Sequence, residues 1–263
     1  MTRTVSQLLD LKGKTALVTG GSRGLGLQLA HALGEAGARI MLSSRKASDL
    51  EEAAGELQAA GIDARWIAAD CAKEEEIHRL AEETLQRLGD VDILVNNAGA
   101  AWGAPAEDYP VEAWDKLMNL NVRGYFILSQ HIAKRSMIAR KYGRIVNIAS
   151  IAGLGGNPPE MQTLAYNTSK GAVITFTQAL GCEWGKYNIT VNAICPGFFP
   201  SKMTQATLDR LGQDELAAHA PLRRLGDDED LKGVALLFAS DAGKHITGQW
   251  LAVDGGVSVV TGG

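Results

Sequence analysis

The sequence of 263 residues contains little cysteine. Cys71, Cys182 and Cys195 are far apart and form no C-x-x-C pair. A sparse, odd set of cysteines excludes a disulfide framework and predicts a reducing compartment. The five histidines lack metal-ligand spacing as well. We therefore expect no metal site.

Long apolar runs are also missing from the sequence. No stretch approaches the ~18 residues that a membrane span needs, and the N-terminus lacks the apolar core of a secretory signal. The 26 Lys+Arg and 30 Asp+Glu give a net charge of −4. No basic run favours nucleic acid or an anionic membrane surface. We expect a cytoplasmic protein that acts on a small molecule, without nucleic acid or membrane as partner.

Short apolar segments alternate with longer amphipathic ones along the chain, which indicates strands and helices in turn. Nearly continuous apolar strands separated by helices are typical of a parallel sheet covered on both faces. No linker or low-complexity tract divides the chain, so we expect one doubly wound α/β domain over residues 1–263. The predicted strands are 15–19, 39–43, 64–69, 91–95, 143–149, 189–194 and 249–253, and the predicted helices are 24–37, 47–60, 73–88, 111–140, 163–186 and 227–240.

A glycine-rich segment, Thr19-Gly-Gly-Ser-Arg-Gly-Leu-Gly26, lies between the first predicted strand and the first predicted helix. Gly20 permits a tight turn, Gly24 lets the backbone approach a pyrophosphate, and Gly26 permits close packing of helix on sheet. Free amides at the start of the helix favour phosphate. Such a turn alone is often purely structural, but its place after the first strand favours a dinucleotide site.

The end of the second predicted strand bears on the choice of cofactor. Sites that prefer NAD carry an acid there for the ribose hydroxyls, whereas this chain has Ser44 followed by Arg45. Arg45 and Arg23 can pair with a 2′-phosphate through charge-assisted hydrogen bonds. Either arginine alone could be a solvated surface residue. Both together, without the acid, favour NADP(H).

Tyr166 and Lys170 are four residues apart, on one face of the opening turn of a predicted helix. A cation near a phenol favours the phenolate, so Tyr166 could transfer a proton near neutral pH. Ser150, at the end of the preceding strand, could hydrogen-bond the same carbonyl oxygen. Tyr-x-x-x-Lys alone is also an ordinary amphipathic start of a helix. The hypothesis of a catalytic site depends on Ser150 and the glycine-rich segment converging on the same edge of the sheet.

These motifs resemble those of the short-chain dehydrogenase/reductase family, over about residues 11–256. The matching pieces are TGGSRGLG at 19–26, Asp70, NNAG at 96–99, Asn121, Ser150, YNTSK at 166–170, PG at 196–197 and VDGG at 253–256. The resemblance implies a Rossmann-type sheet of about seven strands and a tetramer or dimer. The bacterial branches that this sequence is similar to include reductases of 3-oxoacyl thioesters.

The resemblance implies catalytic roles for four residues. Tyr166 would be the acid/base, and Lys170 would lower the pKa of its phenol and bind the nicotinamide ribose. Ser150 would orient and polarise the substrate carbonyl. Asn121 would hold a water that links Lys170 to solvent.

The resemblance also implies a set of cofactor-binding residues. Asp70 would contact adenine, Pro196 and Gly197 would flank the nicotinamide, and Ser201 stands where many members carry a threonine that bonds the carboxamide. Tyr166 and Lys170 would take part too. The remaining expected contacts are Gly20, Ser22, Arg23, Gly24, Leu25, Gly26, Ser44, Arg45, Cys71, Asn97, Ala98 and Gly99. For Cys71 we expect an inert, packed thiol.

The segments beside the expected substrate site depart from the family pattern. The fifteen residues between Ser150 and Tyr166 are a few more than usual, which lengthens the loop beside the substrate. Residues 198–225, punctuated by Pro200 and Pro221, should form a lid. The expected apolar lining consists of Trp102, Leu154, Phe198, Phe199 and Met203.

Three functions remain open on the sequence. The leading hypothesis is NADP(H)-dependent reduction of a ketone, such as a 3-oxoacyl thioester, to a secondary alcohol. The alternative within enzymes is a dehydrogenase of sugar acids or polyols, of the gluconate 5-dehydrogenase kind. A non-catalytic sensor of NADP is disfavoured because Asn121, Ser150, Tyr166 and Lys170 are all present. Apolar residues on more than one face of helices 111–140 and 163–186 predict a two-fold interface in a homotetramer.

Overall fold

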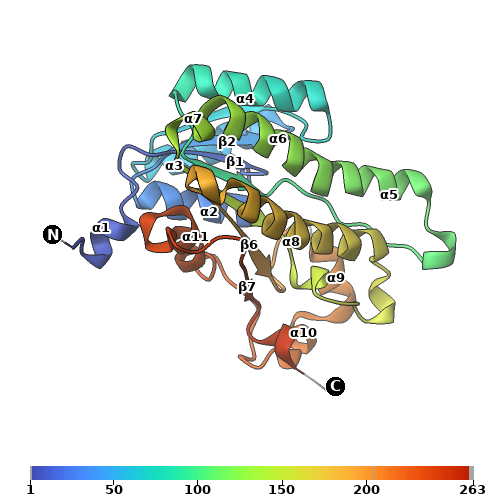
Figure 1. Cartoon of the computed structure of the whole chain (residues 1–263). Helices are drawn as coiled ribbons and strands as arrows, with labels where there is room; N and C mark the ends of the chain where they lie inside the picture. The colour runs from blue at the N-terminus through green and yellow to red at the C-terminus, as the bar shows by residue number, and fades with distance from the viewer. Residues whose placement is uncertain (1, 203, 261–263) are drawn as a thin grey trace.

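The computed structural model describes residues 2–202 and 204–260, in which strands and helices alternate (Figure 1). Within these residues seven strands form one parallel sheet in the order β3-β2-β1-β4-β5-β6-β7. The predicted Rossmann-type fold is confirmed. The strands are β1 (Thr15–Thr19), β2 (Arg39–Ser44), β3 (Ala64–Ala68), β4 (Ile93–Asn96), β5 (Gly143–Ile148), β6 (Ile189–Pro196) and β7 (Trp250–Val253).

The helices cover both faces of the sheet. In Figure 1, α4 lies above β1 and β2 and α2 lies below them; α6 packs beside α4, and α11 packs beside α2. The α-helices are α1 (Val5–Leu9), α2 (Gly24–Glu35), α3 (Ala47–Ala59), α4 (Glu74–Leu88), α5 (Val111–Met118), α6 (Gly124–Ile132), α7 (Ile138–Arg140), α8 (Leu164–Trp184), α9 (Gln205–Leu211), α10 (Gln213–His219) and α11 (Lys232–Ala239).

Successive residues of a strand pack into different cores, because side chains alternate between the two faces of a sheet. On β1, Ala16 and Val18 pack with residues of α2, α3 and α11. Leu17, between them, packs with residues of α4 and α6 instead. Both faces of the sheet are therefore dry, which explains why its strands read as continuous apolar runs.

Several predicted elements differ from the structure. The helix predicted over 111–140 contains two π-helical segments, Asn119–Arg123 and Ala133–Met137. The last helix begins at Lys232 instead of 227, because Asp227 and Asp230 accept hydrogen bonds from the backbone amides of Glu229 and Asp227 and so form a turn. The short helix α1 was not predicted. No helix in the described ranges is long and apolar enough to cross a membrane.

Candidate active site

The carboxyl ends of the central strands bring most of the predicted site residues to one edge of the sheet. The glycine-rich segment follows β1, the NNAG segment begins at the end of β4, Ser150 follows β5, and Pro196 ends β6. Because these strands are parallel, their carboxyl ends lie at the same edge. The convergence on which the hypothesis of a catalytic site depends is present.

The glycine-rich segment has the conformation that a dinucleotide needs. Gly20 and Gly24 adopt positive φ angles of 64° and 54°. A Cβ on Gly26 would lie 2.2 Å from the carbonyl oxygen of Gly20. Asn97 Nδ2 fixes the turn by donating to the carbonyl oxygens of Thr19 (2.9 Å) and Gly20 (3.1 Å).

Helix α2 begins immediately after this turn. Its N-cap residue, Arg23, makes no capping hydrogen bond through its side chain. The amides of the first turn are therefore left to a ligand or to water. A tight glycine turn in front of these amides fits a pyrophosphate.

The two arginines predicted to select NADP(H) differ in their surroundings. Arg23 Nη1 donates to Asp49 Oδ2 at 3.1 Å, whereas Arg45 is exposed at the end of β2. Half-buried Ser44 ends this strand, and the carbonyl oxygen of Ser43 accepts the amide of Gly21 at 3.2 Å. This bond joins the end of β2 to the glycine-rich turn. Arg23 shares its charge with Asp49, while Arg45 is accessible to a ligand.

Tyr166 and Lys170 lie on the first turns of α8, which begins at Leu164. Lys170 is only 4% exposed, and its Nζ donates to the carbonyl oxygen of Ile148 at 2.8 Å. The same Nζ lies 5.7 Å from the centre of the Tyr166 ring. Burial lowers the pKa of Lys170 to about 8, because a dry environment disfavours the ammonium ion.

The pKa of the Tyr166 phenol is shifted in the opposite direction from the expectation that Lys170 lowers it. Burial raises the pKa of Tyr166, and hydrogen bonding with the Ser150 side chain lowers it in part. In the protein alone, the Lys170 ammonium binds the Ile148 carbonyl oxygen. Tyr166 is therefore protonated at neutral pH and able to donate a proton. The Ser150 hydroxyl also accepts the amide of Ala152 at 3.1 Å, which orients its lone pairs.

Asn121 is fully buried and joins two parts of the site. Its side-chain amide accepts from the Ala100 amide (3.0 Å) and donates to the Ala100 carbonyl (2.9 Å) and to Ser169 Oγ (3.0 Å). These bonds tie the NNAG segment to α8. They also use up most of the side chain's hydrogen-bonding capacity, so the expected water toward Lys170 would depend on the backbone of this π-helical turn.

Asp70 and Cys71 follow β3. The Asp70 carboxylate accepts the Ala72 amide at 3.0 Å, and the Asp70 amide donates to Glu76 Oε2 at 2.9 Å. Cys71 is buried, and burial raises the pKa of its thiol to about 12. The side chain of Cys71 is therefore the inert, packed thiol that was expected.

The segment after β6 crosses the glycine-rich turn. The Gly197 amide donates to the Val253 carbonyl at 2.9 Å, and a Cβ on Gly197 would lie 2.7 Å from Asp254 Cβ. Ser201 Oγ lies 3.0 Å from Thr204 Oγ1. The Cβ of Ser201 is 3.7 Å from the position that a Cβ on Gly24 would take. The start of the expected lid therefore lies against the turn after β1.

The expected apolar lining is only partly where the sequence predicted it. Phe199 is 3% exposed and packs in the core instead, with its ring against Gly226. Trp102 and Leu154 are 45% and 37% exposed. Phe198 is partly buried, and Met203 lies outside the described residues. Arg210 of α9 donates to the Glu160 carbonyl at 3.0 Å, which joins the lid to the lengthened loop.

Two features of the site were not anticipated. Tyr125 lies beside Lys170, with 5.8 Å between Nζ and its ring centre. A buried chain of hydrogen bonds also runs from Asn96 to Asn147 (2.9 Å) and on to Thr177 (2.9 Å).

In the part of the chain that the structure describes, no group of three or more His, Cys, Asp and Glu side chains is placed to hold a metal ion.

Comparison with known proteins agrees with this geometry. Residues 14–211 match the family described as short chain dehydrogenase. The chain is 40% identical, over 94% of its length and 97% of the relative, to the rhamnolipids biosynthesis 3-oxoacyl-[acyl-carrier-protein] reductase of Pseudomonas aeruginosa. It is 36% identical, over 96% of its length and 97% of the relative, to gluconate 5-dehydrogenase of Gluconobacter oxydans.

A solved structure matches as well. The gluconate 5-dehydrogenase of Burkholderia cenocepacia, in complex with NADP and tartrate, superimposes with a TM-score of 0.92 at 34% identity, covering 98% of this chain and 100% of that one. The chain belongs to the short-chain dehydrogenase family, and it is an oxidoreductase of that family.

Proposed function

We propose that this protein is an NADP(H)-dependent enzyme that reduces a ketone, a 3-oxoacyl thioester or a related carbonyl compound, to a secondary alcohol. The observation that carries the proposal is the cluster of the Ser150 and Tyr166 side chains with buried Lys170, beside the glycine-rich turn. A nicotinamide bound at that turn would supply the hydride. The protein supplies the proton and the orientation of the substrate.

Each residue of the cluster has a distinct task in this proposal. Tyr166 donates its proton to the carbonyl oxygen, for which a phenol that is protonated at neutral pH is suited. Ser150 hydrogen-bonds the same oxygen and orients it. Lys170 binds the nicotinamide ribose and places a positive charge near the phenol. Asn121 keeps the NNAG segment in register with α8.

The residues that we propose to bind the cofactor come from the same edge of the sheet. The turn with Gly20, Gly24 and Gly26 and the first amides of α2 would hold the pyrophosphate. Asp70 would meet the adenine, and Arg45 with Arg23 the 2′-phosphate. Also proposed as contacts are Ser22, Leu25, Ser44, Cys71, Asn97, Ala98, Gly99, Pro196, Gly197 and Ser201. We place this machinery in a single domain spanning 1–263, with residues 198–225 as the substrate lid.

A dehydrogenase of a sugar acid or polyol is the second candidate. It is favoured by the relatives from Gluconobacter oxydans and Burkholderia cenocepacia, which are named gluconate 5-dehydrogenases. The relative from Pseudomonas aeruginosa, which is named a 3-oxoacyl reductase, favours the first. Arg224, at the end of the expected lid, does not add support for a substrate on an anionic carrier, because its guanidinium already donates to Asp230 at 2.5 and 2.7 Å.

One spectrophotometric screen tests the proposal. Oxidation of NADPH is followed with acetoacetyl thioesters, simple ketones and keto-sugar acids as separate substrates. We expect turnover of a thioester or ketone. Turnover of keto-sugar acids alone would select the second candidate, and binding of NADPH without any turnover would favour a sensor.

We expect Arg45→Ala to remove much of the preference for NADPH over NADH. Arg45 is exposed at the end of β2, whereas Arg23 already pairs with Asp49, so Arg45 should carry more of the 2′-phosphate interaction. Each lost charge-assisted hydrogen bond should cost about 1–3 kcal/mol of binding free energy. Dissociation constants of both cofactors, for the native protein and the variant, check this. Equal affinities in the native protein would contradict it.

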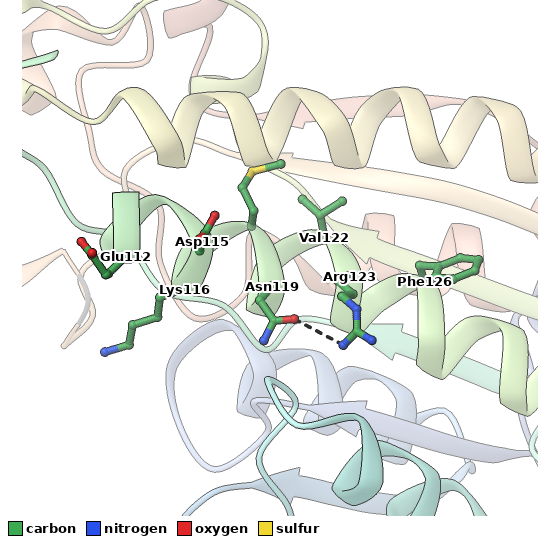
Figure 2. A pocket seen from close by; sticks show the side chains of 8 residues that line it. Glu112, Asp115, Lys116, Asn119, Val122, Arg123 and Phe126 are labelled. Atoms are coloured by element: carbon green, nitrogen blue, oxygen red, sulfur yellow. Dashed lines mark hydrogen bonds between the residues drawn. The ribbon is translucent and has the colours of Figure 1, made fainter. Parts of the chain in front are cut away.

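A homotetramer is proposed for the assembly, in a reducing, cytoplasmic compartment. A tetramer with two-fold axes needs two different self-complementary surfaces. The first is the surface expected from the sequence, along α5, α6 and the neighbouring α8, where Val122 and Phe126 line a groove together with charged residues such as Asp115 and Arg123 (Figure 2). Phe126 is 47% exposed, whereas Leu117 and Ile127 of the same helices pack inward. The second surface is the edge strand β7 with its neighbours, where Trp250, Leu251, Leu222, Val259 and Val260 are exposed.

Light scattering at micromolar concentration should therefore return the mass of four chains. Phe126→Glu should reduce this mass, because it replaces an exposed apolar side chain of the proposed two-fold surface by a charge that would lie near its own copy. Ala59→Glu, on an exposed residue of α3, which packs on β3 at the opposite edge of the sheet from β7, is the matched control and should leave the mass unchanged. A monomer mass for the native protein would refute the assembly.

A further inference from the structure

A buried tyrosine that the proposed reaction does not use lies beneath the site. Tyr125, on α6, is 2% exposed, and its hydroxyl donates to the carbonyl oxygen of Ile148 at 3.3 Å. The same oxygen accepts Lys170 Nζ at 2.8 Å. The Ile148 carbonyl thus accepts hydrogen bonds both from Lys170, which belongs to the proposed active site, and from Tyr125, which has no role in the proposed reaction.

The Ile148 carbonyl is available because the sheet opens at this point. Ile148 is the last residue of β5, and its neighbour β4 ends at Asn96. The next two amides of that chain segment, those of Asn97 and Ala98, donate to Thr19 Oγ1 at 3.0 and 3.1 Å instead of to β5. A buried carbonyl without a ladder partner needs another donor. Lys170 and Tyr125 provide two.

Lys170 has a competing demand in the proposed function. Its Nζ would lie 3.6 Å from a Cβ on Gly99, so the ammonium borders the NNAG segment as well as Ile148. The proposed function asks the same ammonium to bind the ribose of a nicotinamide, and a shift of Nζ toward that ribose would lengthen its bond to Ile148. A carbonyl left buried and unpaired would then oppose cofactor binding.

We propose that Tyr125 is a positioning residue that satisfies the Ile148 carbonyl when Lys170 turns to the cofactor. The inference depends on the proposed function, because it needs NADP(H) to bind beside Lys170. At 3.3 Å the bond of the hydroxyl is long for an O–H donor. It can shorten as the bond from Lys170 lengthens.

The chemistry of Tyr125 suits this task. Burial raises the pKa of its phenol well above the ordinary value, so the hydroxyl keeps its proton at neutral pH. A neutral donor supports the carbonyl without neutralising Lys170. Tyr125 itself is buried, whereas Tyr166 is partly exposed and is the tyrosine assigned to the substrate.

The test compares Tyr125→Phe with the native protein in direct binding of NADPH, measured by calorimetry. We expect the dissociation constant to rise about 3- to 10-fold, the effect of one net hydrogen bond. The thermal midpoint of the ligand-free protein should stay within about 2 °C. Tyr142→Phe is the matched control: its ring also faces a cation, Lys14 at 3.8 Å, and it lies next to the amino end of β5, at the opposite edge of the sheet from the proposed site. It should bind NADPH like the native protein.

A second pair of variants separates positioning from simple packing. In a Lys170→Met background no ammonium leaves the carbonyl, so adding Tyr125→Phe should not weaken NADPH binding further. Native-like binding by Tyr125→Phe would overturn the inference and leave the proposed function intact. The inference would also be overturned by an equal loss of binding in both backgrounds together with a lower thermal midpoint, because that result indicates a packing effect. If the native protein itself did not bind NADPH, the proposed function would fail, and the inference with it.

Discussion

Tyr166→Phe is expected to lower turnover by ~10²–10⁴-fold, the range for a lost general acid, while NADPH still binds. The substitution removes one hydroxyl and keeps the ring, so the packing of the first turn of α8 should survive. The Lys170–Ile148 and Ser150–Ala152 hydrogen bonds do not involve Tyr166. The loss should therefore fall on kcat, with little change in the dissociation constant of the cofactor.

The pH dependence of the native protein gives a second readout of the same residue. Because burial raises the pKa of Tyr166, the acid form persists at neutral pH, and reduction should decline only when the pH rises through that raised value. As the pH rises, Lys170, whose pKa is about 8, should lose its charge before Tyr166 loses its proton. The binding of the ribose should therefore weaken before proton donation declines. Tyr187→Phe, at a half-buried tyrosine just before β6 and so at the amino ends of the strands, is a suitable control. Turnover of Tyr166→Phe within a few-fold of native would end the assignment.

The sequence predicts the edge of the site well, because its signals are local. Glycines with positive φ, a phenol and an ammonium one turn apart, and apolar strands of the right length are all properties of short segments. The structure places the corresponding elements within a few residues of the predictions. The role of Asn121 came from resemblance alone, and the roles of both Asn121 and Ser150 stay predictions.

The supporting residues could not be predicted, because contacts between distant segments define them. Tyr125 lies on a helix with apolar residues on more than one face, and its neighbours along the chain do not indicate a contact with the Ile148 carbonyl. Asn96 and Asn147 occupy neighbouring strands and meet only through the register of β4 on β5. Phe199 was expected in the lining because it is an apolar residue at the start of the expected lid, yet Gly226, which is distant in sequence, opens the space that buries its ring.

Arg144 is another residue whose surroundings the sequence hides. It belongs to β5 and was read only as part of an apolar strand, yet it is 1% exposed and among the largest fully buried side chains. Its Nη2 donates to Asp241 Oδ1 at 2.9 Å, and its guanidinium lies 4.5 Å from the centre of the Tyr142 ring. Asp241 also accepts Arg3 Nη1 at 2.6 Å. One carboxylate thus joins the N-terminal segment to a buried cation.

Asp241→Asn is expected to lower the free energy of unfolding by about 3–5 kcal/mol, because it leaves the buried Arg144 guanidinium without a counter-charge. Arg144→Met should cost less, since the remaining carboxylate is 29% exposed and keeps Arg3 as partner. Arg3→Ala removes only an exposed partner and should cost less than about 1 kcal/mol. Denaturant unfolding at a single protein concentration compares the three, because assembly shifts apparent stability.

The pH dependence of the same variants distinguishes a charge effect from a packing effect. Burial raises the pKa of Asp241, but the hydrogen bonds and charges of Arg3 and Arg144 outweigh burial and lower it below the ordinary value of 3.8. A carboxyl with a lowered pKa in the folded state stabilises the protein above about pH 4, and this contribution is lost as the pH falls through the lowered pKa. The native protein should therefore approach the stability of Asp241→Asn in acid, while the double variant with Arg144→Met should be more stable than Asp241→Asn at neutral pH. If the double variant were less stable than Asp241→Asn, Arg144 would act through packing, and the account of a compensated buried charge would be wrong.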